Sequence, residues 1–215
     1  MNTSPRNKIC NILCWNIRGI NSENKWLAIA HKIEESACAI ICLQETKREN
    51  FDHSYLRKFC PRRFDRFCFQ PSQGASGGLI VIWSSSTFNG TLISCSPFEI
   101  TIQFCSTASS SDVCFLTNIY GPCSGDLRNN FTQWLNGIEF QPDANWILMG
   151  DFNFIRSAEN RNLLGGDMND IMIFNDIISN VGLQELPLKG RSYTWSNMQD
   201  QPLLQQLDWF FTSPA

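Results

Sequence analysis

The sequence has 215 residues, a length that fits one domain of the larger α/β or β-sandwich kind. Hydrophobic residues make up 43% of the chain and aromatic residues 12%, a composition that supports a substantial core and excludes an intrinsically disordered protein. The formal net charge of −3 does not indicate a nucleic-acid partner, and no apolar stretch reaches the length of a membrane span.

Apolar runs and helical spacing predict alternating strands and helices in the first part of the chain. ICNILCWNI predicts a buried strand over residues 9–17, and WLAIAHKIEE has the spacing of a helix over 26–35. CAIICLQE predicts a second strand over 38–45, and GGLIVIW a third over 77–83. Strands and helices therefore alternate here, as they do in α/β proteins.

The middle of the chain reads as hairpin-like β structure followed by a helix. Short β-like runs occupy 91–95 and 98–105, and VCFLTNIY predicts a strand over 113–120. The Gly-Pro turn at 121–122 ends that strand, and LRNNFTQWLNGI predicts a helix over 127–138.

The last part of the chain continues the pattern. WILMG predicts a strand over 146–150, and Asp170 is expected to cap a helix that stops at Gly182. YTW at 193–195 and LDWFF at 207–211 predict two late strands. Taken together, these elements predict packed sheets flanked by helices.

The ten cysteines do not form a recognisable metal or disulfide pattern. They are scattered through apolar segments without a CxxC pair, and only His31 and His53 could add imidazole ligands, so the spacing does not favour a zinc site. We expect buried free thiols in a reducing compartment. The N-terminus also lacks the apolar core and cleavage site of a signal peptide, which predicts an intracellular protein, nuclear or cytoplasmic, that is not secreted.

Residues 57–66 carry five basic side chains and one acid, with aromatic residues between them. Such a segment could contact phosphates. An exposed helix-and-loop face would have the same composition, and both interpretations remain open.

Polar residues recur at or near the ends of the predicted strands. In chain order these are Asn16, Glu45, Asn118, Tyr120, Asp151, Asn153 and Asp208. Taken singly, each could be an ordinary capping or turn residue. If the strand ends converge, however, they build a concave site of carboxylates, amides and one phenol.

This set of groups suits phosphate chemistry. Carboxylate oxygens with water favour Mg²⁺ or Mn²⁺, and a metal so bound can polarise a phosphoryl oxygen. Amides and a tyrosine hydroxyl can donate hydrogen bonds to charge that develops on the phosphate. No Ser-His-Asp elbow or Walker loop is present, which argues against acyl transfer and nucleotide triphosphate hydrolysis.

The ordered set of motifs resembles the endonuclease/exonuclease/phosphatase superfamily, the group of DNase I and the apurinic endonucleases. The matching pieces are CWNIRG, LQET, SGGLIVIW, NIYGP, GDFN, YTW and LDWF, from residue 14 to residue 211. CWNIRG, LKGRSYTW and LDWFF especially resemble the endonuclease domains of plant LINE-type non-LTR retrotransposons. The resemblance implies a four-layer α/β sandwich, with two packed mixed sheets flanked by helices and the site at one edge.

The resemblance also implies roles for the polar residues. Glu45 would bind the divalent metal, Mg²⁺ or Mn²⁺, with Asn16 beside it, and Tyr120 would donate a hydrogen bond to the scissile phosphate. Asp151 would orient or deprotonate the attacking water or protonate the leaving group, and Asn153 would help to hold the phosphate and Asp151.

Three further positions complete the assignment. Asp208 would orient a catalytic histidine. Asn118 and Arg18 are candidates for substrate contact, although Asn118, like Thr194 and Trp195, also fits a scaffold role.

Two departures from the family pattern stand out. Arg18 occupies a position where many apurinic endonucleases carry an aspartate, a change that retroelement relatives share. The family's C-terminal Ser-Asp-His motif has no counterpart in this sequence, and neither His31 nor His53 can take its place. We therefore expect one domain over residues 1–215 that is incomplete at its C-terminus, lacks the final strand or strands and is catalytically impaired.

The resulting expectation is divalent-metal-dependent phosphodiester hydrolysis by a DNA endonuclease of retroelement origin. Its partner would be the phosphate backbone of DNA, and we expect a monomer that binds neither a membrane nor a small-molecule cofactor. Two alternatives remain. One is a non-catalytic remnant that at most binds DNA or a protein, and the other is a phosphoesterase that acts on a substrate other than DNA.

Overall fold

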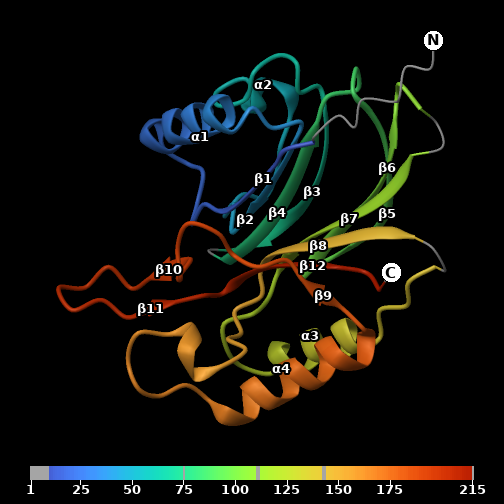
Figure 1. Ribbon diagram of the computed structural model, residues 1–215. Coiled ribbons are helices and arrows are strands. Elements are labelled where there is room, and N and C mark those ends of the chain that lie inside the picture. Colours follow the sequence, from blue (N-terminus) through green and yellow to red (C-terminus); the bar gives the residue numbers. More distant parts are fainter. Residues whose placement is uncertain (1–9, 75, 110–111, 142–143, 215) are drawn as a thin grey trace.

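The computed structural model describes residues 10–74, 76–109, 112–141 and 144–214 (Figure 1). Residues 1–9 lie outside the described part of the chain. They include the first residue of the strand predicted over 9–17 and the first part of the segment that was compared with a signal peptide. No helix in the described ranges is long and apolar enough to cross a membrane.

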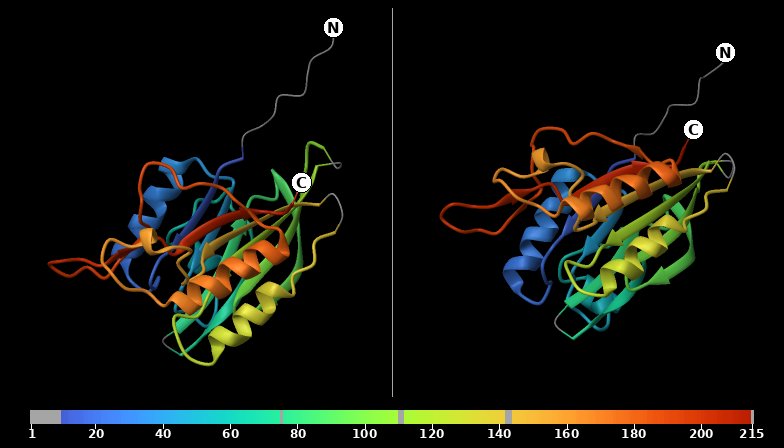
Figure 2. Two further views of the ribbon diagram at one scale, coloured as in Figure 1. Left: turned by 60° about the horizontal axis from the view of Figure 1, so that its bottom comes forward. Right: turned by 90° about the horizontal axis from the view of Figure 1, so that it is seen from below.

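Two mixed β-sheets form the centre of the molecule. The first has the order β1 (Ile12–Asn16), β2 (Ile40–Gln44), β4 (Ser76–Trp83) and β3 (Arg66–Gln73). The second has the order β5 (Phe88–Ser96), β6 (Glu99–Ser106), β7 (Val113–Tyr120), β8 (Asn145–Asp151), β12 (Asp208–Thr212) and β9 (Gln184–Glu185). The short pair β10 (Trp195–Ser196) and β11 (Leu204–Gln205) forms a hairpin that extends away from the sheets (Figures 1 and 2).

Helices cover the outer faces of both sheets. In Figures 1 and 2, α1 (Glu23–Ser36) and α2 (His53–Leu56) lie on one side, and α3 (Leu127–Asn136) and α4 (Met168–Val181) lie on the other. Separate apolar clusters fill the space under α1 and α2, between the sheets, and under α3 and α4. This arrangement confirms the predicted fold class of two packed mixed sheets flanked by helices.

The pairing of the strands brings the predicted site residues to one edge. β1 runs parallel to β2, with Asn16 opposite Gln44, and β7 runs parallel to β8, with Tyr120 opposite Asp151. β12 runs antiparallel to β8, so that its first residue, Asp208, lies opposite Asp151. Because parallel strands end at the same edge of a sheet, polar residues that are far apart in the sequence meet there.

Several predicted elements differ in detail. The N-cap of α4 is Asp167 and not Asp170, because the Asp167 carboxylate accepts hydrogen bonds from the backbone N–H groups of Asn169 and Asp170. Gly182 ends α4 in the left-handed conformation, as predicted. The predicted strand over 193–195 is reduced to the two-residue β10, which begins at its last residue.

The cysteines are free, as predicted, but not uniformly buried. Among the described residues Cys38, Cys42 and Cys60 are buried, whereas Cys10, Cys95 and Cys123 are exposed. The expectation of ten buried thiols was therefore wrong. Cys10, Cys95 and Cys123 lie just before β1, late in β5 and in the loop after β7, respectively.

The basic segment 57–66 lies away from the site edge. Its last residue, Arg66, is opposite Trp83, which in turn is opposite Ile40 at the start of β2. Arg57 donates to backbone carbonyls of its own loop, and Arg63 forms an ion pair with Glu34. These contacts favour the interpretation of this segment as a surface face.

Candidate active site

A buried polar pair fixes the floor of the site between the two sheets. Asn118 is fully buried; its side chain accepts a hydrogen bond from Gln44 and donates to the carbonyls of Leu43 and Ile80. No part of Asn118 is therefore available to a substrate, which corrects its assignment as a substrate-binding residue. Because Gln44 immediately precedes Glu45, Asn118 is a scaffold residue that holds the end of β2.

Asp151 lies at the centre of the site, at the end of β8. The residue is 2% exposed. Its Oδ2 accepts a hydrogen bond of 2.7 Å from Asn16 Nδ2, and its Oδ1 accepts one of 3.0 Å from the backbone N–H of Asn153. Gly150 allows this close packing, since a Cβ at that position would lie 2.0 Å from the carbonyl oxygen of Ile119 on β7.

The surroundings of Asp151 raise its pKa to about 7. Burial is the largest cause, the negative charge of Asp208 is the next, and the charge of Glu45 adds to them. The hydrogen bonds from Asn16 and Asn153 oppose the rise. A carboxyl group whose pKa lies near neutrality can both accept and give up a proton at physiological pH.

Asp208 is the second acid of the site. Burial raises its pKa, whereas a hydrogen bond with Thr194 and the positive charges of Arg191 and Arg18 lower it. The Thr194 hydroxyl also accepts hydrogen bonds from the backbone N–H groups of Leu207 and Asp208. Thr194 therefore fixes the start of β12, a scaffold role that agrees with its interpretation from the sequence.

Glu45 follows β2 in a turn that the glycines of β4 hold in place. Thr46 and Lys47 donate backbone hydrogen bonds to the carbonyls of Gly78 and Gly77. A Cβ at Gly78 would lie 2.3 Å from the Thr46 hydroxyl, which explains the glycine. The Glu45 side chain is 18% exposed, and its Oε1 contacts Lys47 Nζ at 2.9 Å.

Backbone strain concentrates around the site. Arg18, Glu45, Lys47 and Asn153 all adopt a positive φ of between 52° and 55°. Each such conformation costs of order 1–3 kcal/mol for a residue other than glycine and occurs mainly at functional sites.

Tyr120 and Arg18 border the acids. Burial raises the pKa of the Tyr120 phenol, and the charges of Glu45, Cys123 and Asp151 raise it further, so the group stays protonated and can donate a hydrogen bond. The Arg18 guanidinium lies 5.4 Å from the ring centre of Trp195 and donates to the carbonyl of Ser196. Arg18 thereby ties the site to the β10–β11 hairpin.

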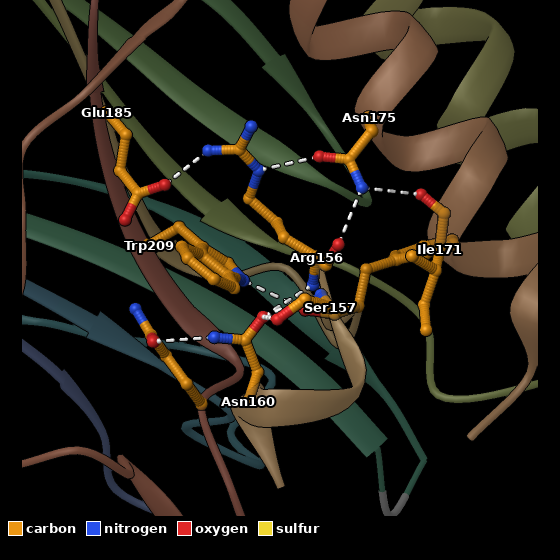
Figure 3. Close-up of polar contacts among 9 residues, drawn as sticks. Arg156, Ser157, Asn160, Ile171, Asn175, Glu185 and Trp209 are labelled. Carbon is orange, nitrogen blue, oxygen red and sulfur yellow. Dashed lines mark hydrogen bonds and ion pairs between the residues drawn. The ribbon is translucent and has the colours of Figure 1, made fainter. Parts of the chain in front are cut away.

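Asn153 acts mainly through its backbone. Its N–H holds Asp151, and its side-chain Nδ2 donates to the carbonyl of Gly121 at 2.7 Å. The segment that follows is braced by Arg156, which donates to Asn175 and Glu185, while Asn175 donates back to the carbonyl of Arg156 (Figure 3). This network joins the loop after β8 to α4 and β9.

A cavity of about 570 Å³ opens beside the acids. Its lining includes Asn16, Arg18, Asp151, Arg191 and Asp208. Thus the structure brings four of the predicted site residues to one cavity. Arg191, in the motif LKGRSYTW, was not predicted to be a site residue; the fold places it in the lining of this cavity, where its positive charge lowers the pKa of Asp208.

The donor groups fit a hard divalent cation. Glu45 Oε2 accepts no hydrogen bond from the described residues, and Asn16 Oδ1 accepts a single hydrogen bond, from the backbone N–H of Arg18. The described ranges contain no cluster of three or more His, Cys, Asp or Glu side chains that could hold a metal. A cation here would therefore complete its shell with water and phosphate oxygens, as Mg²⁺ commonly does.

Both histidines lie outside this site. His31 is an exposed residue of α1, and the ring of His53, at the start of α2, packs 5.2 Å from that of Phe67. Asp208 therefore has no histidine partner among the described residues.

The raised pKa of Asp151 predicts a pH-dependent cost to stability. Between about pH 4 and pH 7 the folded state holds a proton on Asp151 that the unfolded chain has released, so the free energy of unfolding falls as the pH rises. We expect the wild type to lose stability relative to Asp151→Asn over this window, by about 1.4 kcal/mol per unit of pKa difference. Urea unfolding of both proteins at several pH values measures this effect. A stability difference that does not change with pH would contradict it.

The fold and the site together define an α/β sandwich with an acidic site at the ends of its strands. The chain belongs to the Endonuclease/Exonuclease/phosphatase family, whose model matches residues 13–215. A comparison with curated proteins found no match.

Solved structures share the fold at low sequence identity. The AP endonuclease LMAP from Leishmania major superposes with a TM-score of 0.71 at 16% identity, over 95% of this chain and 79% of that one. The endonuclease domain of TRAS1, a telomere-specific non-LTR retrotransposon, gives 0.69 at 15% identity, over 95% and 85%. A mannosyl-6-phosphatase from Bacteroides thetaiotaomicron gives 0.57 at 14% identity, over 96% and 86%.

Proposed function

We propose that this chain is a divalent-metal-dependent phosphodiesterase that acts on the DNA backbone, as an endonuclease of retroelement origin. The observation that carries the proposal is the environment of Asp151. This buried carboxyl has a pKa of about 7, and the charges of Asp208 and Glu45 contribute to the rise. The side-chain amide of Asn16 and the backbone N–H of Asn153 hold it in place. The cavity beside it also presents Arg18 and Arg191. Membership of the family and the likeness to endonuclease structures support the reaction class.

The residues of the site divide the chemistry between them. Asp151 orients or deprotonates the attacking water, or protonates the leaving oxygen, and its pKa suits either direction of proton transfer. The protonated Tyr120 phenol donates a hydrogen bond to the charge on the phosphate. Asn16 and Asn153 fix the carboxylate in one orientation, which reduces the cost of reaching the reactive geometry.

Glu45, with Asn16 beside it, would hold Mg²⁺ or Mn²⁺. A bound cation of this kind supplies charge that stabilises a phosphoryl oxygen and a leaving oxyanion. The ion pair with Lys47 keeps the Glu45 side chain in place at the end of its strained turn.

One observation favours a second candidate, a non-catalytic remnant that binds DNA or a protein. Neither histidine of the sequence lies at the site, so Asp208 does not orient one among the described residues. Loss of a general acid–base group costs about 10²–10⁴-fold in rate.

The substrate class is tested by a comparison of two phosphoesters. We expect the chain to nick supercoiled plasmid in Mg²⁺ and not in EDTA, and to leave phosphoinositide in vesicles intact. A single nick relaxes a whole plasmid, so gel electrophoresis with protein in excess detects even a slow reaction. Hydrolysis of phosphoinositide without nicking would overturn the assignment of DNA as the substrate.

A further inference from the structure

A second cavity shares Trp195 with the cavity of the site. It has a volume of about 610 Å³, and Asn153 and Trp195 line it. Trp195 also lines the cavity that contains Asp151. The two hollows are therefore neighbours along the site, and each presents a pair of arginines: Arg18 and Arg191 in the first, and Arg128 and Arg161 in the second.

The guanidinium of Arg161 has no hydrogen-bond or ion-pair partner among the described residues, and its Nε is buried. Burial of a donor without a partner costs about 1–3 kcal/mol, and more for a charged group. The backbone of Arg161 is nevertheless fixed, because it forms an antiparallel bridge with Gln205. Its guanidinium lies against Gly165 and Gly166, where a Cβ on Gly165 would lie 3.5 Å from a terminal nitrogen.

Other arginines of this region have partners, which makes Arg161 exceptional. Arg156 is satisfied by Asn175 and Glu185 (Figure 3). Arg128 pairs with Asp170 at 2.7 Å, donates to three backbone carbonyls, and lies 3.8 Å from the ring centre of Phe154. Of the two arginines that line the second cavity, Arg161 is therefore the one whose guanidinium has no partner among the described residues.

Neither acid that lines the second cavity forms an ion pair with Arg161. Asp170 pairs with Arg128, and Asp167 Oδ1 accepts the hydrogen bonds that cap α4. Residues 139–215 hold only four basic side chains against ten acids, so an unpaired arginine here is notable. Its free donors attract an anion, and a planar guanidinium matches the oxygens of a phosphate.

We propose that Arg161 binds a phosphate of the nucleic-acid backbone that flanks the scissile phosphate. This inference rests on the proposed function. The strand would pass from the first cavity, over Asp151 and Asn153, into the second. Arg161 thus serves as a positioning residue that fixes the strand without reading its sequence.

The salt dependence of DNA binding tests this inference. Each phosphate contact releases condensed counterions, so loss of one contact makes the plot of log affinity against log salt shallower by about 1. We expect Arg161→Gln to reduce the slope by this amount and to weaken binding by about tenfold on two duplexes of unrelated sequence. Fluorescence polarisation in EDTA, over a series of salt concentrations, measures both quantities without cleavage.

Three variants serve as controls. Arg161→Lys should keep the slope, since it retains the charge, and Arg161→Met should reproduce the effect of Gln if the Gln variant folds poorly. Arg63→Gln removes an arginine at the opposite end of the first sheet, where it pairs with Glu34, and should leave the slope unchanged. Thermal unfolding of each variant confirms that it is folded.

The outcomes separate this inference from the proposed function. Suppose that the wild type binds duplex DNA, and that the Arg161→Gln and Arg161→Met variants are folded and show the same salt slope as the wild type. Arg161 then does not contact a phosphate, and this inference fails while the proposed function stands. If the wild type does not bind duplex DNA in a salt-dependent way, the proposed function fails first. An equal loss of slope in Arg63→Gln would also overturn the assignment, because the effect would then reflect net charge.

Discussion

Replacement of Asp151 by asparagine is expected to slow plasmid nicking by about 10²–10⁴-fold, the usual contribution of a general acid–base group. The substitution keeps the size of the side chain and removes the carboxyl that transfers the proton. Its Oδ1 can still accept the hydrogen bond from the backbone of Asn153. Single-turnover nicking with protein in excess over supercoiled plasmid measures the rate.

A matched substitution controls for loss of charge. Asp176 is an exposed residue of α4, and Asp176→Asn should nick at the wild-type rate. DNA affinity of Asp151→Asn in EDTA should stay at or above that of the wild type, since a negative charge is lost. Retention of the wild-type rate by a folded Asp151→Asn protein would show that Asp151 does not take part in proton transfer.

Replacement of Glu45 by glutamine is expected to abolish Mg²⁺-dependent nicking and to weaken Mn²⁺ binding by at least about 10–100-fold, the cost of losing even an outer-shell partner of a metal. Glu45 is a half-buried acid just after the end of β2, and its side chain is 18% exposed. Titration with Mn²⁺, followed by its electron paramagnetic resonance signal, measures metal affinity independently of activity.

Glu49 provides the control for this substitution. It is an exposed carboxylate four residues further along the same loop, and Glu49→Gln should bind Mn²⁺ and nick DNA as the wild type does. Unchanged Mn²⁺ affinity in Glu45→Gln would place the metal elsewhere and remove the main role assigned to this residue.

The sequence predicted those parts of the fold in which local pattern and tertiary environment agree. The apolar run at 113–120 coincides with β7, because burial on both faces produces a continuous apolar strand and the Gly-Pro turn ends it. β3 was missed because its residues are mostly half-buried and its start overlaps the basic segment 57–66. The N-cap of α4 was predicted three residues too late because both candidates are aspartates with the same capping propensity. In the structure Asp167 accepts the capping hydrogen bonds, whereas Asp170 pairs with Arg128.

The site, too, could be predicted only where a local sequence pattern marks its residues. Polar residues at strand ends were visible in the sequence, and Asn16, Asp151 and Asp208 do lie together. The scaffold role of Asn118 depends on contacts with Leu43 and Ile80, more than thirty residues away, and no local pattern specifies them. The unpaired guanidinium of Arg161 could not be predicted either. It is unpaired because the nearby acids Asp170 and Asp167 interact with Arg128 and with the start of α4, and these contacts depend on the tertiary fold.

The central claim is metal-dependent cleavage of DNA by the carboxylates of this site, and its most direct test is plasmid nicking by two proteins. One is the 215-residue chain, and the other is the same chain extended with a related Ser-Asp-His segment. The account predicts that both nick in Mg²⁺, that the extended protein is faster by about 10²-fold or more, and that Glu45→Gln stops both. Failure of both proteins to nick, when each is folded and binds duplex DNA, would contradict the account.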